Sequence, residues 1–311
     1  INLSNNTAIT SKGFNKKYFD WTVPKKLDFS GCTGIYYNYF STSRSAFLGC
    51  ATLESISLPD NIGIIPTGIF ENCTGLTSIT IPKGVTDIKS NAFNGCTGIK
   101  EVNLDDGLLN VWDEVFKDCT SLKYIKTPSS VAGFGMNCFS GDINLVVDTR
   151  GTNFKPEDES EWGDTSGVVF LYGEDAKLQD KLTLKTGGEH IITSEIPDGK
   201  TINWGSNNNE VAAVDENGRV TAVSPGTAFI YAKTSDDTYS GFCTVTVTDE
   251  DVPVTGINLN KTNTTLEKGS TDKLTATVTP ETATDKEVAW TSNKPEVATV
   301  DQDGNVAAVS L

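Results

Sequence analysis

The chain has few of the residues on which enzyme catalysis commonly depends. Its 311 residues include a single histidine, His190, which excludes most Ser-His-Asp and Cys-His arrangements unless that residue takes part. The phosphate-binding loop is excluded as well, because the position five residues before Gly199, where a second glycine is required, is Ser194. Carboxylates are plentiful, so composition alone leaves a glycoside hydrolase open. We predict no catalytic residues, no cofactor and no enzyme activity.

Positive charge is also scarce. The chain has 25 Lys and Arg against 41 Asp and Glu, a net charge of −16, whereas nucleic acid and anionic membrane surfaces both require a basic footprint. The sequence also lacks a run of about 20 apolar residues, the length needed to span a bilayer. It begins at Ile1 and is rich in Thr, Ser, Asn and Gly. We therefore expect a processed, exported protein with no nucleic-acid partner and no membrane insertion in this chain.

The seven cysteines lack the spacing of a metal site or of a disulfide framework. Their number is odd, Cys-x-x-Cys pairs are missing, and one histidine is the only further soft ligand. We predict no metal site.

Four of the cysteines repeat every 23 residues, at Cys50, Cys73, Cys96 and Cys119. Each follows a phenylalanine by three residues and precedes an aliphatic residue by three. A fixed period of this length indicates a solenoid of stacked coils, which favours binding over catalysis. Stacked cysteines would lie within disulfide reach but point the same way, which disfavours a bridge. We predict buried thiols that pack as small apolar groups and donate weakly to turn carbonyls.

Each copy combines a short half-buried strand, an exit proline and a short helical turn. One coil cannot bury its apolar side chains alone, so stacking should place Phe on Phe and Cys on Cys. The best-formed copy reads Leu76-x-x-Ile79-x-Ile81-Pro82 for the strand and Ala92-Phe93-x-x-Cys96 for the turn.

Both ends of the array depart from this pattern, as capping coils should. Cys32 precedes Cys50 by only 18 residues, and Asn38 stands where the other strands have an aliphatic residue. At the other end Asp142 replaces the ladder cysteine, and after residues 143–147 the period fades into an acidic stretch. Residues 168–172 form a strand that closes the solenoid or opens the following domain.

These motifs resemble the BspA-like leucine-rich repeat over about residues 29–147, a head of about five coils. Proteins of that family are typically bacterial surface or secreted molecules that adhere to host matrix, other bacteria or glycans. The resemblance therefore implies an extracellular or cell-surface location and an adhesive role.

The second half contains two segments that match each other at an offset of 86 residues. Short Thr- and Val-rich strands separated by Asn/Asp-Gly turns indicate antiparallel sandwiches, and the pattern resembles the bacterial Ig-like domain of group 2, a family that usually acts as a spacer. We expect a leucine-rich-repeat solenoid with its N-terminal cap over residues 1–173, followed by all-β Ig-like sandwiches over 174–249 and 252–311, the last one incomplete. The matched positions are Trp204, Val211, Asp215, Gly218 and Val220 against Trp290, Val297, Asp301, Gly304 and Val306.

Some conspicuous residues of this half have simple structural interpretations. Trp204 and Trp290 are expected to be core residues of their sandwiches. The acidic residues 157–164 and the Asp301–Gly304 segment lack the full alternating loop of a calcium site, and we interpret them as a solvated linker and a hairpin turn.

Two groups of residues are candidates for ligand binding. The polar positions between the apolar residues of the strands form a sheet face, which solenoids commonly use for binding, although a merely solvated surface has the same pattern. An aromatic strand in the first coil could stack on sugar rings or simply cap the solenoid. The candidate residues are Tyr36, Tyr37, Tyr39, Thr80, Asn103, Tyr124 and Lys126.

The predicted function is an exported bacterial surface protein that adheres through its solenoid head. Its partner would be a host or bacterial surface protein or a glycan. Two alternatives stay open, a structural stalk and an accessory carbohydrate-binding part of a larger enzyme.

Overall fold

The computed structural model describes residues 25–30 and 47–310, which form strands and turns with one short 3-10 helix, η2 (Pro156–Glu161). The chain divides into two compact units. The first extends to Leu178 and includes Ser194–Asn207 and Tyr231–Phe242, and the second comprises Gln179–Thr193, Asn208–Ile230 and the chain from Cys243 onward. In the described ranges, no helix is long and apolar enough to cross a membrane.

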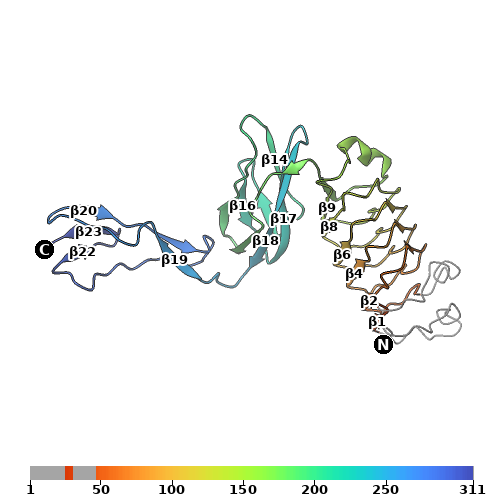
Figure 1. Cartoon of the computed structure of the whole chain (residues 1–311), viewed down its shortest axis with the longest axis horizontal. Helices are drawn as coiled ribbons and strands as arrows, with labels where there is room; N and C mark the ends of the chain where they lie inside the picture. Colours follow the sequence, from red (N-terminus) through yellow and green to blue (C-terminus); the bar gives the residue numbers. More distant parts are fainter. Residues whose placement is uncertain (1–24, 31–46, 311) are drawn as a thin grey trace. The chain divides into compact units, whose positions relative to one another are not determined.

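The repeats of the first unit form a solenoid whose strands stack in parallel along one side (Figure 1). Its register repeats the sequence period, because Ile79 lies opposite Val102, 23 residues later. Pro82 follows the strand that ends at Ile81, as expected, whereas Asp105 follows the strand that ends at Leu104. The segment around Phe93 forms turns rather than a helical turn. The four-stranded sheet consists of β1 (Lys26–Asp28), β2 (Ser55–Ser57), β4 (Ser78–Ile81) and β6 (Glu101–Leu104).

A second parallel sheet lines another side of three successive coils. Ile65 lies opposite Ile88 and Ile88 opposite Val111, so this sheet has the same 23-residue step. Its strands are β3 (Ile64–Ile65), β5 (Asp87–Ile88) and β7 (Asn110–Val111).

Phenylalanine rings stack through the centre of the solenoid. Phe70 and Phe93 have ring centroids 5.3 Å apart and planes 11° apart, and Phe93 and Phe116 follow at 5.6 Å and 6°. All three rings are at most 1% exposed. The predicted stacking of Phe on Phe is therefore confirmed.

The cysteines form a parallel ladder of weak hydrogen bonds. Cys73 Sγ donates to the carbonyl of Phe47 at 2.9 Å, and Cys96 Sγ donates to that of Phe70 at 3.0 Å. Burial raises the pKa of the Cys96 thiol to about 12, so it stays protonated. The described cysteines are all buried, and none of them forms a disulfide, as expected for a packing role.

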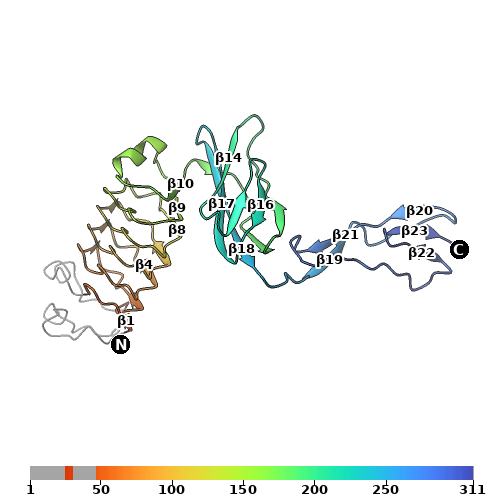
Figure 2. The same ribbon diagram turned by 180° about the vertical axis from the view of Figure 1, so that it is seen from behind.

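The solenoid continues beyond the point at which the sequence period fades. β10 (Val168–Leu171) pairs in parallel with β9 (Leu145–Asp148), and Val168 lies opposite Leu145, again 23 residues away (Figure 2). β10 therefore closes the solenoid. The sequence alone did not decide between this role and the first strand of the following domain. The third strand of this sheet is β8 (Tyr124–Lys126), in the order β10-β9-β8.

Aromatic residues seal this end of the solenoid core. Phe134 makes edge contacts with Phe139, Phe154 and Trp162, with centroids 4.9 to 5.3 Å apart. Trp162 is 4% exposed. Phe154 and Trp162 thus fill the end of the core, where the phenylalanine and cysteine of the repeat motif are no longer present.

The two longest strands are β17 (Gly226–Thr234) and β18 (Tyr239–Thr248). They belong to a five-stranded sheet in the order β11-β18-β17-β14, with β12 also paired to β18. The antiparallel arrangement expected for this sandwich is only partly correct, because β12 pairs with β18 in parallel. The remaining strands of this sheet are β11 (Glu174–Asp175), β12 (Lys181–Lys185) and β14 (Ile202–Ser206).

The second unit shows the 86-residue repeat as matching antiparallel pairs. Ala212 lies opposite Ala222, and Ala298 lies opposite Ala308. The first pair joins β15 (Ala212–Val214) to β16 (Arg219–Ala222), which also pairs with β13 (Glu189–Ile191). The second joins β22 (Ala298–Val300) to β23 (Asn305–Ala308), which also pairs with β20 (Thr271–Lys273). A separate antiparallel pair is formed by β19 (Gly256–Leu259) and β21 (Ala276–Thr279) (Figure 2).

The two matched tryptophans are less buried than expected. Trp204 and Trp290 are both half-buried rather than core residues. Trp290 packs over the hairpin turn, where a Cβ added to Gly304 would lie 3.2 Å from the indole ring. The turn itself follows the prediction, since Asp301 accepts hydrogen bonds from the amides of Asp303 and Asn305.

Candidate functional site

The polar residues predicted on the strand face point outward in regular rows. Thr80 on β4 lies opposite Asn103 on β6. Ser57 and Lys126 occupy the same position in the coils before and after them, and all four side chains are exposed. Because the apolar neighbours of each residue fill the core, the backbone holds these side chains at the spacing of adjacent strands, about 4.8 Å.

The candidate residues gather in two open hollows on this face. Thr80 lines one of about 650 Å³. Asn103, Tyr124 and Lys126 line another of about 480 Å³. In the second hollow the amide of Asn103 donates to Glu101 Oε1 at 2.8 Å, which leaves its carbonyl oxygen directed to other donors. Tyr36, Tyr37 and Tyr39 lie outside the described residues.

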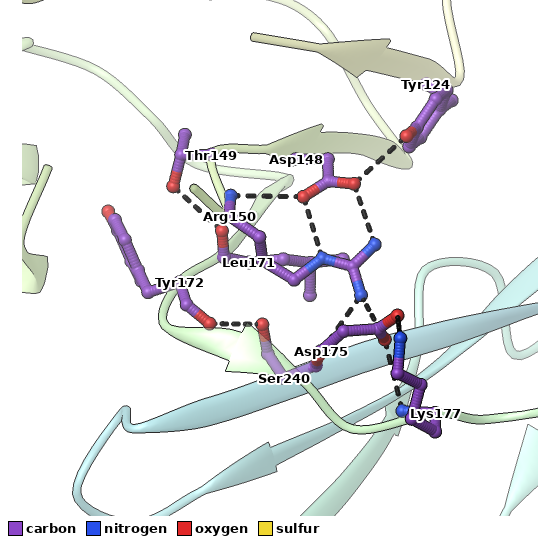
Figure 3. A network of polar contacts seen from close by, with 9 residues as sticks. All are labelled: Tyr124, Asp148, Thr149, Arg150, Leu171, Tyr172, Asp175, Lys177 and Ser240. Carbon is purple, nitrogen blue, oxygen red and sulfur yellow. Dashed lines mark hydrogen bonds and ion pairs between the residues drawn. The ribbon is translucent and has the colours of Figure 1, made fainter. Parts of the chain in front are cut away.

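Tyr124 has a structural partner that its sequence context did not suggest. Its hydroxyl donates to Asp148 Oδ2 at 3.0 Å (Figure 3), and its ring lies 5.0 Å from that of Phe242. Burial, followed by the charge of Asp148, raises the pKa of the Tyr124 phenol above its usual range. The phenol is therefore a stable donor, and much of its ring is committed to packing.

Asp148 is the centre of the polar network drawn in Figure 3. It is 2% exposed and accepts two parallel hydrogen bonds from Arg150, from Nε to Oδ1 and from Nη2 to Oδ2, each 2.8 Å long. Arg150 Nη1 also donates to Asp175 Oδ1 at 2.7 Å and to the carbonyl of Ser240 at 3.2 Å. A bidentate guanidinium pair of this kind is strong and directional.

The network joins three segments of the first unit. Asp148 ends β9, Asp175 lies on β11, and Ser240 lies on β18. β9 is thereby tied to residues 174–175 and 239–240 by side-chain hydrogen bonds. The sequence analysis did not identify Asp148 and Arg150 as partners. A signal was present, because the chain has only three arginines and Arg150 follows Asp148 by two residues.

The described residues offer little to a metal or to acid-base chemistry. Among them, no group of three or more His, Cys, Asp or Glu side chains is arranged to hold a metal ion. His190 is half-buried and shares a hydrogen bond of 3.3 Å with Gln179 Oε1.

Family models match most of the chain. The model for the BspA type leucine rich repeat region matches residues 26–149 as six copies. The model for the bacterial Ig-like domain of group 2 matches residues 189–247 and 253–311.

Comparison with individual proteins finds partial relatives. An uncharacterised protein of Clostridium acetobutylicum is 36% identical over 155 residues, which are 46% of this chain and 16% of the relative. An Ig-like virion protein of Serratia phage KSP90 is 36% identical over 102 residues, 32% of this chain and 40% of the relative. The chain thus spans less than half the length of these curated relatives. The crystal structure of the T. pallidum leucine rich repeat protein has 26% identity and a TM-score of 0.35, covering 40% of this chain and 58% of that one.

Proposed function

Because this chain joins a BspA-type leucine-rich-repeat region to two bacterial Ig-like domains of group 2, we propose that it is an exported bacterial adhesion protein. Both kinds of domain are typical of surface-associated proteins with binding or spacer roles and are typically non-catalytic. In this proposal, residues 1–173 form the binding head, and Ig-like domains over 174–249 and 252–311 hold it away from the cell. The partner is a host or bacterial surface protein or a glycan.

The observation that carries the proposal is the row formed by Ser57, Thr80, Asn103 and Lys126. Each side chain is exposed at the same position of its coil, while the residue before it in the strand is buried. The scaffold thus holds variable polar groups on an invariant core, which is how repeat proteins present a binding surface. Rigid spacing lowers the ordering cost of binding.

The strand face can be tested by adding bulk and charge to the middle of this row. The full chain is immobilised and exposed to fibronectin, laminin, type I collagen and a glycan array. We expect at least one component to bind, and the Thr80→Arg/Asn103→Arg variant to weaken that binding about tenfold or more, as for a central interface residue.

The matched control is Thr74→Arg/Thr97→Arg, which places two arginines on exposed turn positions that are also one period apart. This variant has the same charge change and should bind like the unmodified chain. Equal losses in the two variants, or no binding to any component, would contradict adhesion through the strand face.

A further inference from the structure

The second sheet of the solenoid contains an abrupt step in side-chain size. Backbone hydrogen bonds align the coils, since Trp112 N donates to the Ile88 carbonyl and Gly135 N donates to the Val111 carbonyl. The outward residues of one coil are Leu109, Asn110 and Trp112, and those at the same positions of the next coil are Ala132, Gly133 and Gly135.

Trp112 is held rigidly on the side of the preceding coil. Its indole Nε1 donates to Asp87 Oδ1 at 3.1 Å, and Lys89 Nζ lies 4.1 Å from the ring centroid. Lys89 Nζ also donates to Asp87 at 2.9 Å, as does Asn110 Nδ2 at 3.3 Å. Partial burial opposes ionisation of Asp87, but the hydrogen bonds from Lys89, Trp112 and Thr86 lower its pKa to about 2. The carboxylate therefore stays charged, and the indole is preorganised.

The next coil has glycine at the position of Trp112, and the Asp113 carboxylate lies there, with Oδ1 2.6 Å from where a Cβ of Gly135 would be. Gly135 takes the place that Lys89 and Trp112 occupy in earlier coils, and it has no side chain to cover the ring. A Cβ at Gly135 would lie 2.3 Å from the backbone nitrogen of Asp113, so only glycine fits there, whereas a Cβ at Gly133 would meet nothing within 4 Å. Open space therefore lies at Gly133, which has the position of Asn110 in the next coil.

This space has an apolar wall and polar edges. Trp112 is 44% exposed and Leu109 is 46% exposed. Both are large apolar side chains, and exposed apolar surface of this kind often marks an interaction site. Asn110 and Asp113, on either side of this segment, are exposed. Asp113 Oδ1 already accepts a hydrogen bond from Met136 N at 2.8 Å, so Asp113 Oδ2 and the carbonyl oxygen of the Asn110 side chain are the acceptors available to a ligand. The shelf, defined here as Leu109, Asn110, Trp112, Asp113 and Gly133, thus combines one flat apolar surface with peripheral acceptors.

We infer that this shelf is a binding subsite for a neutral sugar ring, stacked on the indole of Trp112. A pyranose has an apolar C–H face that suits an aromatic ring and hydroxyl donors around its edge that suit the acceptors of Asp113 and Asn110. A proline ring would also stack, but it has no donors, so the rim acceptors would lose water without compensation. The negative charge of the chain and of Asp113 disfavours anionic ligands.

The inference concerns the second sheet and is independent of the proposed strand-face function. The full chain labelled with 5-fluorotryptophan contains five tryptophans and should give one fluorine resonance for each, with Trp112 assigned through Trp112→Phe. Cellopentaose, chitopentaose and mannopentaose are added separately, up to about 10 mM, a concentration that detects weak binding. We expect at least one of them to shift the Trp112 resonance and to leave the others unchanged.

Filling the shelf without touching Trp112 provides the decisive variant. Gly133→Leu places a side chain in the open space and should weaken the sugar-induced shift about tenfold or more. Gly63→Leu is the matched control, because Gly63 directly precedes β3 of the same sheet, in an earlier coil, and also has open space around it. It should titrate like the unmodified chain.

Two results would overturn the inference. In the first, none of the three oligosaccharides shifts the Trp112 resonance, whether or not a proline decapeptide shifts it. In the second, Gly133→Leu titrates as the unmodified chain does. The resonances of the other tryptophans report whether each variant is folded, so loss of binding can be separated from loss of structure.

Discussion

Asp142 occupies the ladder position of a cysteine in the last coil, and this substitution predicts a strong pH dependence of stability. Its side chain is 0% exposed, and in the described part of the chain neither carboxyl oxygen has a hydrogen-bond partner. In the coil before it, Cys119 Sγ donates to the Phe93 carbonyl at 3.3 Å. The equivalent carbonyl for position 142 is that of Phe116, which a thiol or a protonated acid can approach as a donor but a carboxylate cannot.

The magnitude follows from the shifted pKa of Asp142. Burial, helped by the negative charge of Asp118 and opposed by the Cys119 backbone and the positive charge of Lys123, raises this pKa from 3.8 to about 8. Cys119 and Cys138, which also face the carboxyl group, stay neutral because burial raises the pKa of each thiol. Between pH 4 and pH 8 the unfolded chain ionises Asp142 while the folded chain keeps it protonated.

The sign of the effect is a loss of stability as pH rises. The contribution of Asp142 is fully present below pH 4, falls by about 1.4 kcal/mol per pH unit, and is roughly 4 kcal/mol smaller at pH 7. Asp142→Asn removes the titration but keeps the shape. Asp142→Cys also restores a ladder donor, so we expect it to be the most stable of the three proteins at pH 7 and its advantage over the unmodified chain to shrink toward pH 4.

Urea unfolding at a series of pH values measures these slopes. The fluorine resonance of 5-fluoro-Trp162 is a local reporter, because Trp162 is 4% exposed and its carbonyl accepts a hydrogen bond from Asn137 N in the adjacent coil. The difference between the unmodified chain and Asp142→Asn cancels the titration of all other groups. If that difference is constant from pH 4 to pH 8, the reasoning about a buried neutral acid is wrong.

Three further predictions concern the core and the network. Phe93→Ala should lower the free energy of unfolding by about 3 to 5 kcal/mol in urea, and a near-neutral change would contradict the aromatic ladder. Arg150→Met should cost about 3 to 5 kcal/mol, because Asp148 is left buried and unpaired; full additivity with Asp148→Leu in a double-mutant cycle would show that the pair is not coupled. Cys96 should resist iodoacetamide at pH 8 until urea is added, as followed by peptide mass spectrometry, because burial raises its thiol pKa to about 12; rapid native labelling would contradict a buried ladder thiol.

The outcome at Tyr124 shows where prediction from the sequence reached its limit. The period placed Tyr124 on the same side of its strand as Lys126, and the structure has both on β8 with the buried Ile125 between them. The sequence did not reveal that its hydroxyl donates to Asp148, 24 residues away, or that its ring meets Phe242. Such partners depend on how segments that are not repeats fold back, and no periodic signal encodes that.

β10 illustrates the same limit for the fold. The motif residues fade before Val168, yet the backbone keeps the 23-residue register with Leu145. Parallel pairing requires only backbone donors and acceptors in line, so a coil can continue without the Phe and Cys of the motif when other aromatic residues, here Phe134 and Trp162, fill the core.

The sequence by itself determined the solenoid, the stacking of Phe93 between its neighbours and the inert state of the ladder thiols. These properties are local and repeated, so the spacing of residue types is sufficient to specify them. Only the tertiary structure decided that Arg150 ties β9 to β11 and β18 and that Trp112 is left 44% exposed next to a coil with glycine at the same position. Both depend on what lies one coil away or further along the chain, because a side chain is covered or exposed according to its neighbours in space.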